Sequence, residues 1–263
     1  MTLLNLHGKN ALVTGIANER SIALGIAKQL HKAGATLGVT YLPDDREPAK
    51  SSKTKVGNLT QPFNPSFLLP CDVQKDEDIA NLYSEVSKHW ERLDILIHCL
   101  AFANREDLSG SFSDISRAGF HLALDVSAYS LIPLCRGAKP LMKEGGSVIT
   151  LTYIGGVRVV PNYNVMGIAK SALEMNVRYL AQDLGKDKIR VNAISAGPIR
   201  TLASAAVAGI LDMIHHVEKV APLKRSVTQE EVGNAAAFLA SDLASGITGQ
   251  IIYVDCGYEI MGA

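Results

Sequence analysis

Residues 10–14 read NALVT, and this short apolar run is followed by Gly15 and then by a helical pattern at residues 21–33 (SIALGIAKQLHKA). In that pattern the apolar residues recur at the spacing of one helix face. A short apolar run bounded by a turn is typical of a strand that is buried on both sides. The stretch therefore predicts a strand, a turn and a helix, in that order.

The same alternation continues along the chain. Further strand signals occur at residues 35–41, 66–70, 94–100, 147–152, 189–194 and 250–255. Helical patterns occur at residues 76–90, at 113–143 as one or two helices, and at 162–184, 202–220 and 228–241. Strands that are apolar on both faces and separated by helices predict an α/β fold, a doubly wound parallel sheet (Rossmann fold) with helices on both faces. Only the polar, proline-containing residues 42–65 give no clear prediction.

The size and charge of the chain exclude some functions. It has 263 residues, with 26 Lys and Arg residues against 26 Asp and Glu residues. This length suits one large domain, so we expect a single Rossmann-type domain over residues 1–263. The balanced charge creates no field that would attract a nucleic acid or an anionic membrane, and we expect neither as a partner.

The cysteines and the apolar runs bear on the compartment. Cys71, Cys99, Cys135 and Cys256 show no CxxC spacing and lie in apolar surroundings, which is typical of reduced thiols in the cytoplasm. The sequence indicates no metal site. No apolar run approaches the ~18 residues that span a bilayer, and residues 1–10 lack the pattern of a secretion signal. We therefore expect a cytoplasmic, unprocessed protein outside the membrane.

The turn after the first predicted strand is a candidate nucleotide site. At residues 14–23 (TGIANERSIA) a glycine lets the backbone come close to a ligand, and the start of a helix offers unpaired N–H groups to a pyrophosphate. The pattern is not GxGxxG, because only Gly15 and Gly25 are present. Ser21 either caps the helix or binds a phosphate. Asp72 and Val73, after the third strand, either hold an adenine or form a turn.

Tyr163 and Lys170 are candidate catalytic residues. Seven residues apart on a predicted helix, they are related by ~700° of rotation and lie on one face, ~10.5 Å apart along the axis. An ammonium near a phenol favours the phenolate and lowers the pKa of the phenol, so the pair suits proton donation in a reduction. The alternative is a packed ring and a solvated amine.

Several motifs in order along the chain resemble a known family. They are Gly15-x5-Ser21-Ile22-Ala23, Asp72-Val73, HCLAFA at residues 98–103, Tyr153, PNYNVMGIAK at residues 161–170 and SAGPIRTLA at residues 195–203. Together they resemble enoyl-[acyl-carrier-protein] reductase, a divergent branch of the short-chain dehydrogenase/reductase superfamily. The resemblance runs nearly end to end. It implies reduction of the carbon–carbon double bond of trans-2-enoyl thioesters by hydride transfer from NAD(P)H, the last step of each fatty-acid elongation cycle.

The resemblance also implies catalytic roles. Ordinary short-chain dehydrogenases have Tyr-x3-Lys, whereas this chain has Tyr-x6-Lys, which suits an acceptor whose negative charge appears on a thioester oxygen. Tyr163 would donate a hydrogen bond to that developing enolate. Lys170 would hold the hydroxyls of the nicotinamide ribose. Tyr153 would lie beside the substrate, although an aromatic residue that merely closes a strand is its alternative.

The cofactor and substrate residues follow by the same resemblance. Those implied to bind NADH are Gly15, Ser21, Ile22, Leu42, Asp72, Val73, Leu100, Lys170, Ile199, Arg200, Thr201, Leu202 and Ala203. Ala103 would touch the acyl substrate, together with Tyr153 and Tyr163. A helix and loop at about residues 202–220 would bind the substrate and move over it, or would be a plain surface helix.

Other features leave alternatives open. Leu42 replaces a glutamine that is frequent in the family, and Arg46 follows it, so NADPH is possible beside NADH. Ala101 replaces a glycine beside the expected nicotinamide pocket. The family implies an acyl carrier protein as substrate carrier, with Lys219, Lys224 and Arg225 as a possible basic rim, and a homotetramer. The competing functions are a carbonyl-reducing short-chain dehydrogenase and a catalytically silent dinucleotide sensor.

Overall fold

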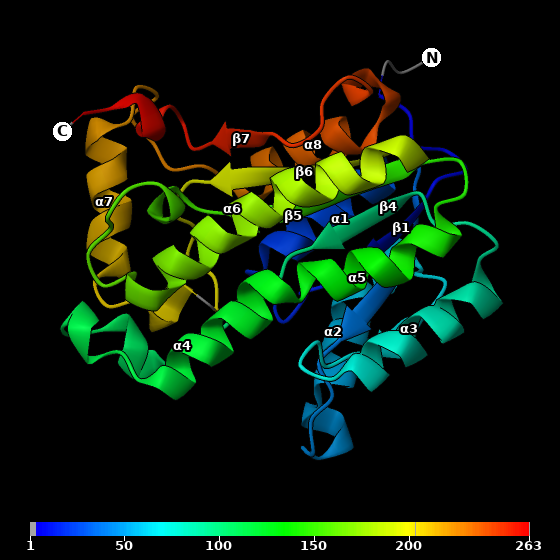
Figure 1. Ribbon diagram of the computed structural model, residues 1–263, viewed down its shortest axis with the longest axis horizontal. Helices are drawn as coiled ribbons and strands as arrows, with labels where there is room; N and C mark the ends of the chain where they lie inside the picture. Colours follow the sequence, from blue (N-terminus) through cyan, green and yellow to red (C-terminus); the bar gives the residue numbers. More distant parts are fainter. Residues whose placement is uncertain (1–3, 203, 263) are drawn as a thin grey trace.

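The computed structural model describes residues 4–202 and 204–262, and Figure 1 shows their arrangement. Within them a parallel sheet has the strand order β3-β2-β1-β4-β5-β6-β7. The strands are β1 (Asn10–Val13), β2 (Thr36–Tyr41), β3 (Leu68–Pro70), β4 (Ile95–His98), β5 (Gly146–Thr152), β6 (Ile189–Ala196) and β7 (Ile251–Val254). The helices are α1 (Ile22–Lys32), α2 (Ser52–Thr60), α3 (Asp76–His89), α4 (Arg117–Leu124), α5 (Leu131–Ala138), α6 (Asn164–Leu184), α7 (Ile210–Val220) and α8 (Gln229–Ala240). The predicted doubly wound parallel sheet is confirmed.

Successive strand residues supply two separate cores. Ala11 and Val13 of β1 pack with α1, α2 and α8, whereas Leu12 between them packs with α3, α5 and α6. This follows from the alternation of side chains across a strand. Because both faces are covered by helices, the strands are apolar throughout, and this property made them recognisable in the sequence.

Strand β1 lies where the order of the sheet reverses, since it pairs with β2 on one side and β4 on the other. In open α/β sheets the ligand lies outside the carboxyl ends of the strands at such a point. Gly25 of α1 lets α8 approach closely, because a Cβ at this position would lie 2.7 Å from the carbonyl oxygen of Gln229. The strand order therefore indicates a ligand site at the carboxyl end of β1. The contact with α8 holds α1 beside it.

Two predicted helices have different bounds in the structure. The predicted helix at residues 202–220 is a 3₁₀ turn (Ser204–Ala206) followed by α7, because Gly209 has a left-handed φ of 78°. The predicted helix at residues 162–184 begins at Asn164, so Tyr163 is its N-cap residue. In the segment without a clear prediction, α2 forms, and the Ser51 side chain accepts a hydrogen bond from the backbone of Thr54 at 3.3 Å.

The predicted helical region 113–143 contains a long helix with a π-helical turn. Residues Arg117–Leu141 form α4, the turn η5 (Asp125–Tyr129), α5 and η6 (Lys139–Leu141). By length and composition this segment is apolar enough to span a membrane, contrary to the expectation that no run approaches that length. Half of its apolar window is buried inside the fold, and Leu131 and Leu134 belong to the second core.

Candidate active site

The carboxyl ends of the strands bring most of the predicted site residues to one edge of the sheet. Figure 1 shows the strand arrowheads pointing toward the side of the molecule where α7 stands. Gly15 follows β1, Leu100 follows β4, Tyr153 follows β5 and Ile199 follows β6. These positions come from distant parts of the chain, and the parallel sheet gathers them.

Gly15 occupies a position that only glycine fits. Its φ is 89°, and a Cβ here would lie 1.9 Å from the carbonyl oxygen of Cys99. The turn after β1 therefore passes directly against the chain that leaves β4. Glycine at this position lets the two backbone segments lie in contact at the strand ends where a dinucleotide site is expected.

Ser21 is buried at the start of α1, but its hydroxyl does not cap the helix. Its Oγ accepts hydrogen bonds from the backbone of Ala17 at 3.0 Å and of Asn18 at 3.1 Å, which folds the turn. The first turn of α1 has no acidic residue and no side-chain cap. The N–H of Leu24 donates to the carbonyl oxygen of Ser21 at 3.0 Å, so it is the N–H of Ile22 that fits an anionic group such as a pyrophosphate.

Asp72 has the turn geometry that was the alternative to adenine binding. Its Oδ1 accepts a hydrogen bond from the backbone of Gln74 at 3.1 Å, and its Oδ2 lies 3.6 Å from Lys75 Nζ. Val73 beside it packs against the second core, as Leu100 does. The carboxylate of Asp72 is therefore occupied by its own turn.

Two of the three predicted catalytic side chains meet at the junction of β5 and α6, and the third is bound to the same strand end. The rings of Tyr153 and Tyr163 meet edge to face, with their centroids 5.0 Å apart. Lys170 is buried, and its Nζ donates a hydrogen bond to the carbonyl oxygen of Leu151 at 2.8 Å. Since Leu151 precedes Tyr153 by two residues, one strand end anchors both the ammonium and a phenol.

Burial decides the pKa values at this junction. It raises the pKa of Tyr163 well above the ordinary value of 10.0, and the neighbouring Tyr153 and Glu174 add to the rise. The expectation that Lys170 would lower this pKa is wrong, because loss of hydration of the phenolate is the largest effect. Burial also raises the pKa of Tyr153 and lowers that of Lys170 to about 8. Tyr163 is therefore a neutral phenol that keeps its proton.

The expected substrate side of the site is apolar. Ala103 belongs to a small buried cluster that also holds Val165, Met166 and Val207, and Tyr163 packs against it. On α7, Met213 accepts a hydrogen bond through its sulfur from the Tyr153 hydroxyl at 2.9 Å. The cluster and α7 thus enclose the two phenols with apolar groups.

The residues after β6 form a capped turn. Thr201 Oγ1 accepts a hydrogen bond from the backbone of Ser204 at 3.0 Å, and Ser204 Oγ accepts one from the backbone of Thr201 at 2.8 Å. Arg200 and Leu202 are exposed, and Ile199 packs against the first core. The predicted Ala203 lies outside the described residues.

The residues expected to determine the preference for NADH or NADPH lie after β2. Leu42 is exposed. The Arg46 guanidinium forms an ion pair with Asp44 and donates a hydrogen bond to Ser52 Oγ at 3.0 Å. Asp44 also accepts from the backbone of Ser52 at 3.0 Å, at the start of α2. The positive charge of Arg46 is therefore compensated within the protein.

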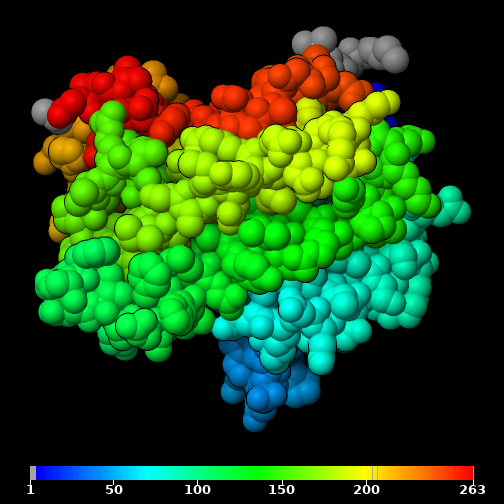
Figure 2. Space-filling model, viewed as in Figure 1, coloured from blue at the N-terminus to red at the C-terminus, as the bar shows by residue number. Residues whose placement is uncertain are grey.

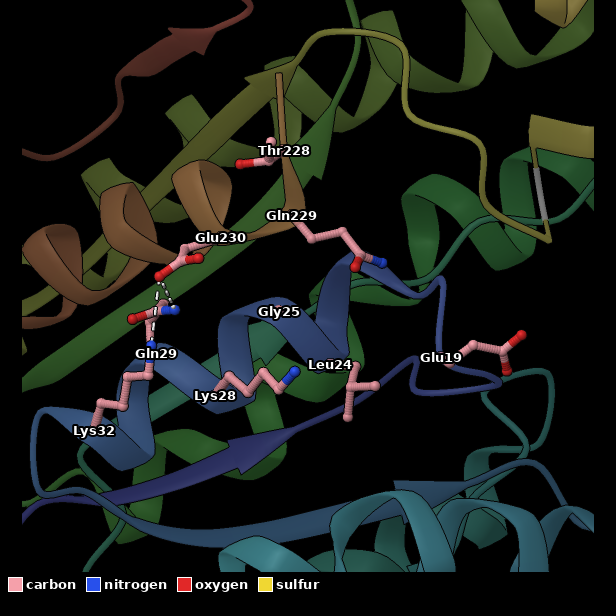
Figure 3. Close-up of a pocket in the computed structure, with 9 residues that line it drawn as sticks. All are labelled: Glu19, Leu24, Gly25, Lys28, Gln29, Lys32, Thr228, Gln229 and Glu230. Atoms are coloured by element: carbon pink, nitrogen blue, oxygen red, sulfur yellow. Dashed lines mark hydrogen bonds and ion pairs between the residues drawn. The ribbon is translucent and has the colours of Figure 1, made fainter. Parts of the chain in front are cut away.

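A pocket of about 440 Å³ between α1 and α8 lies apart from these groups, and Figure 3 shows it. Gln29 Nε2 and Lys32 Nζ both lie 3.4 Å from Glu230 Oε1 and link the two helices. The residues that line it are Glu19, Leu24, Gly25, Lys28, Gln29, Lys32, Thr228, Gln229 and Glu230. Because neither Tyr163 nor Lys170 lines this pocket, it is not the reaction site.

Known proteins are similar to this chain along almost its whole length. The family model described as Enoyl-(Acyl carrier protein) reductase matches residues 15–259. The chain belongs to this reductase family. It is 71% identical to the enoyl-[acyl-carrier-protein] reductase [NADH] FabI of Nostoc sp., over 99% of this chain and 100% of that protein. It is 65% identical to the corresponding protein of Synechocystis sp., over the same shares of the two chains.

Solved structures of the reductase family have the same fold. The Bacillus cereus enzyme with NADP⁺ and indole naphthyridinone has a TM-score of 0.94 at 50% identity, covering 98% of this chain and 99% of that one. The Anaplasma phagocytophilum enzyme in complex with NAD has a TM-score of 0.93 at 41% identity, covering 98% and 96%.

Sequence reasoning assigned no role to two buried polar residues beside this candidate site, His98 and Glu174. His98 is fully buried, with Nδ1 2.7 Å from Thr150 Oγ1 and Nε2 2.8 Å from Ser130 Oγ. Glu174 is buried and accepts a hydrogen bond from Thr152 Oγ1 at 2.7 Å. The position of Glu174, four residues after Lys170, places it on the same helix face, and this spacing was the signal that could have found it.

Proposed function

We propose that this protein reduces trans-2-enoyl-[acyl-carrier-protein] to the saturated acyl thioester with NADH, the last step of the fatty-acid elongation cycle. The observation that carries the proposal is that the carboxyl end of β5 anchors the Lys170 amine through Leu151 and presents Tyr153, whose ring contacts Tyr163. This arrangement lies where a doubly wound sheet binds its ligand. The 71% identity to an NADH-dependent enoyl reductase over almost the whole chain supports the same reaction.

The protein fits NADH through its backbone at the first turn. Gly15 has no room for a side chain, and α1 begins without an acidic residue or a side-chain cap. We propose that this turn, together with Ser21 and Ile22, receives the pyrophosphate, and that Asp72, Val73 and Leu100 border the adenosine. NADH when bound supplies the hydride for the β-carbon of the enoyl thioester.

Tyr163 supplies the hydrogen bond to the reacting thioester. Its pKa is raised by burial, so the phenol keeps its proton at neutral pH and donates a hydrogen bond to the thioester oxygen, where negative charge develops. A donor that is already in place and shielded from water stabilises this charge without reorganisation. The hydrogen bond is made more strongly in the transition state than in the ground state, which is the condition for catalysis.

Lys170 holds the ribose hydroxyls next to the nicotinamide. Its Nζ is fixed by Leu151, which leaves its remaining N–H donors for a ligand. Tyr153 borders the substrate with its ring against Tyr163. Ala103 and the α7 segment cover the acyl chain in this proposal. The turn after β6, with Ile199, Arg200, Thr201 and Leu202, borders the nicotinamide.

We propose NADH as the preferred cofactor. The charge of Arg46 is compensated by Asp44, so a 2′-phosphate would have to displace that carboxylate. The curated relatives at 71% and 65% identity carry NADH in their names. Use of NADPH is the weaker activity in this proposal.

The assembly and location are also proposals. We propose one domain that forms a homotetramer in the cytoplasm, outside the membrane, with acyl carrier protein as its transient partner. The outer surface of α6, which lies open in Figure 2, carries the exposed apolar side chains of Ile168, Met175 and Tyr179. Exposed apolar patches mark interaction sites, which supports association. The cysteines are free, as expected for a reducing compartment.

The decisive experiment follows nicotinamide absorbance with crotonyl thioester, using NADH and NADPH in parallel, and identifies the product by mass spectrometry. A saturated acyl thioester is expected, formed faster with NADH. A 3-hydroxyacyl product from a 3-oxoacyl thioester, formed at a comparable rate, would instead assign a carbonyl reductase. NADH binding without turnover of either substrate would assign a dinucleotide sensor.

A further inference from the structure

The buried face of α6 carries two ionisable side chains among apolar ones. Lys170 is 5% exposed and Glu174, one helical turn later, is 3% exposed. Their neighbours on this face include Val165, Leu173 and Val177. Charged side chains in such surroundings cost free energy unless other groups compensate them, so the presence of both requires a physical reason.

Both side chains are bound by consecutive residues of β5. Lys170 Nζ donates to the carbonyl oxygen of Leu151 at 2.8 Å, and Glu174 Oε1 accepts from Thr152 Oγ1 at 2.7 Å. Gly156 leaves space for the carboxylate, because a Cβ there would lie 2.9 Å from Glu174 Oε1. The next residue of the chain after Thr152 is Tyr153. The contact between Glu174 and Thr152 therefore ties the strand end that presents Tyr153 to the helix that carries Lys170.

We propose that Glu174 is a positioning residue of the reductase: its carboxylate fixes the end of β5 beside Tyr153 and supplies the counter-charge that keeps Lys170 protonated. The inference rests on the proposed function for its catalytic consequence. Its electrostatic consequence concerns NADH binding and does not depend on which substrate is reduced.

The charges around the pair support this role. Burial lowers the pKa of Lys170 to about 8, and Cys99 and then Glu174 oppose that change. Burial also raises the pKa of Glu174, and the hydrogen bond from Thr152 and the charges of Arg178 and Lys170 oppose that rise. Other ionisable groups that act electrostatically on the pair come from several elements, namely His98 at the end of β4, Cys99 after it, Tyr163 at the N-cap of α6, Arg178 on α6 and Tyr253 on β7. Without the carboxylate, Lys170 would lose its proton at lower pH, and its attraction for the ribose and pyrophosphate would weaken there.

The charge is tested with Glu174→Gln, whose amide oxygen still accepts a hydrogen bond from Thr152. NADH affinity is measured by fluorescence titration from pH 6.5 to 9.5. We expect the pH at which affinity is half lost to fall by about one unit, so that the Kd at pH 8.5 rises about five- to tenfold. Asp183→Asn is the matched control, because it removes the same charge from α6 at a side chain that is 62% exposed. An unchanged midpoint in Glu174→Gln would overturn the counter-charge role.

The hydrogen bond is tested with Thr152→Val, which keeps the size of the side chain and removes the hydroxyl. We expect kcat to fall about tenfold with the KM for NADH within twofold, and Thr152→Ser to restore kcat. If Glu174→Gln does not fold, Glu174→Asp keeps the charge, and we expect the wild-type NADH midpoint with the kcat loss of Thr152→Val. Wild-type kcat in Thr152→Val would overturn the positioning role. Failure of the wild-type protein to reduce enoyl thioesters would reject the proposed function, while the NADH titrations would still decide the charge relationship.

Discussion

Tyr153 and Tyr163 meet at an interplanar angle of 68°, although one follows a strand and the other caps a helix. This ring contact orients the two phenols, whose other neighbours differ. The Tyr153 hydroxyl donates to Met213 Sδ at 2.9 Å, whereas Tyr163 packs against the apolar cluster of Ala103. An edge-to-face contact is worth about 1 kcal/mol beyond burial, which helps to hold both rings in place.

The first prediction separates the roles of the two phenols. Tyr163→Phe keeps the ring contact and removes the donor, so kcat should fall about 100-fold or more while the Kd for NADH changes less than twofold. Tyr153→Phe should lower kcat less. Steady-state kinetics with crotonyl thioester and NADH titration measure both. Tyr129→Phe, at an exposed position in the turn η5, is the control and should match the wild type. Unchanged turnover in Tyr163→Phe would remove the central assignment.

The second prediction concerns Asp44. Because this carboxylate compensates the Arg46 guanidinium, Asp44→Asn should free the cation for a 2′-phosphate. We expect the ratio of kcat/KM for NADPH to that for NADH to rise about tenfold. Arg46→Gln added to Asp44→Asn should reverse the gain. No change in the ratio for either variant would mean that this pair lies away from the cofactor.

The third prediction concerns acid stability. Burial lowers the pKa of His98 from 6.5 to about 3. Between these two pH values the imidazole of His98 binds a proton in the unfolded chain but stays neutral in the folded protein. The folded pKa is depressed, and this contribution to stability is present above pH 6.5 and is lost as the pH falls toward about 3.

Replacing His98 by a residue that does not titrate should therefore reduce the loss of unfolding free energy as the pH falls below 6.5. His98→Gln is expected to be less stable than the wild type at pH 7, by the loss of bonds to Thr150 and Ser130. The difference should shrink by roughly 2 to 4 kcal/mol between pH 6.5 and 4. Urea unfolding across this range measures it. A constant difference would contradict the buried neutral imidazole.

The fourth prediction concerns the acyl carrier protein. Arg225 is engaged in a bidentate ion pair with Glu231, and Lys224 Nζ donates to the carbonyl oxygen of Lys219 at 2.8 Å. Among the proposed rim residues, Arg225 is thus partly compensated. If Lys219 and Lys224 still steer an acidic carrier, added salt should lower kcat/KM more for the carrier-bound substrate than for the CoA thioester. Lys219→Ala with Lys224→Ala should remove the extra salt dependence. Equal salt dependence for both substrates in the wild type would reject the hypothesis that these lysines attract the carrier protein.

The strands and most helices were predictable because burial on both faces leaves a plain apolar pattern. Helix α2 was not, since among its nine residues only Val56 and Thr60 are buried. The helix predicted at residues 202–220 was divided by Gly209, and a left-handed glycine cannot be distinguished from a helical one in an alanine-rich sequence. Local composition does not predict such helices well, because their bounds depend on tertiary contacts.

The site was predictable as far as its motifs extend. The resemblance named Tyr163 and Lys170, but the structure adds what burial does to them, and this reversed the expected direction of the Tyr163 pKa. Contacts such as Lys170 with Leu151 and Glu174 with Thr152 join residues about 20 apart through the packing of α6 on β5. The occupied hydroxyl of Ser21 likewise depends on a folded turn. Such pairings arise only when the chain is assembled.

The last prediction tests whether α7 covers the substrate. Met213 is half-buried on α7 and accepts the Tyr153 hydroxyl through a sulfur, which is a weak acceptor. A substrate that engages Tyr153 must break this bond. Met213→Leu keeps a similar apolar volume and removes the acceptor, so the KM for the enoyl thioester should fall about two- to fivefold with kcat unchanged.

A double-mutant cycle makes this test specific. In the Tyr153→Phe background there is no hydroxyl for Met213 to hold, so Met213→Leu should leave KM unchanged there. The same fall in KM in both backgrounds would mean that the leucine acts through packing alone. A rise in KM in the wild-type background, absent from the Tyr153→Phe background, would mean that the bond to Met213 prepares Tyr153 for the substrate, and α7 would then belong to the assembled site instead of blocking it.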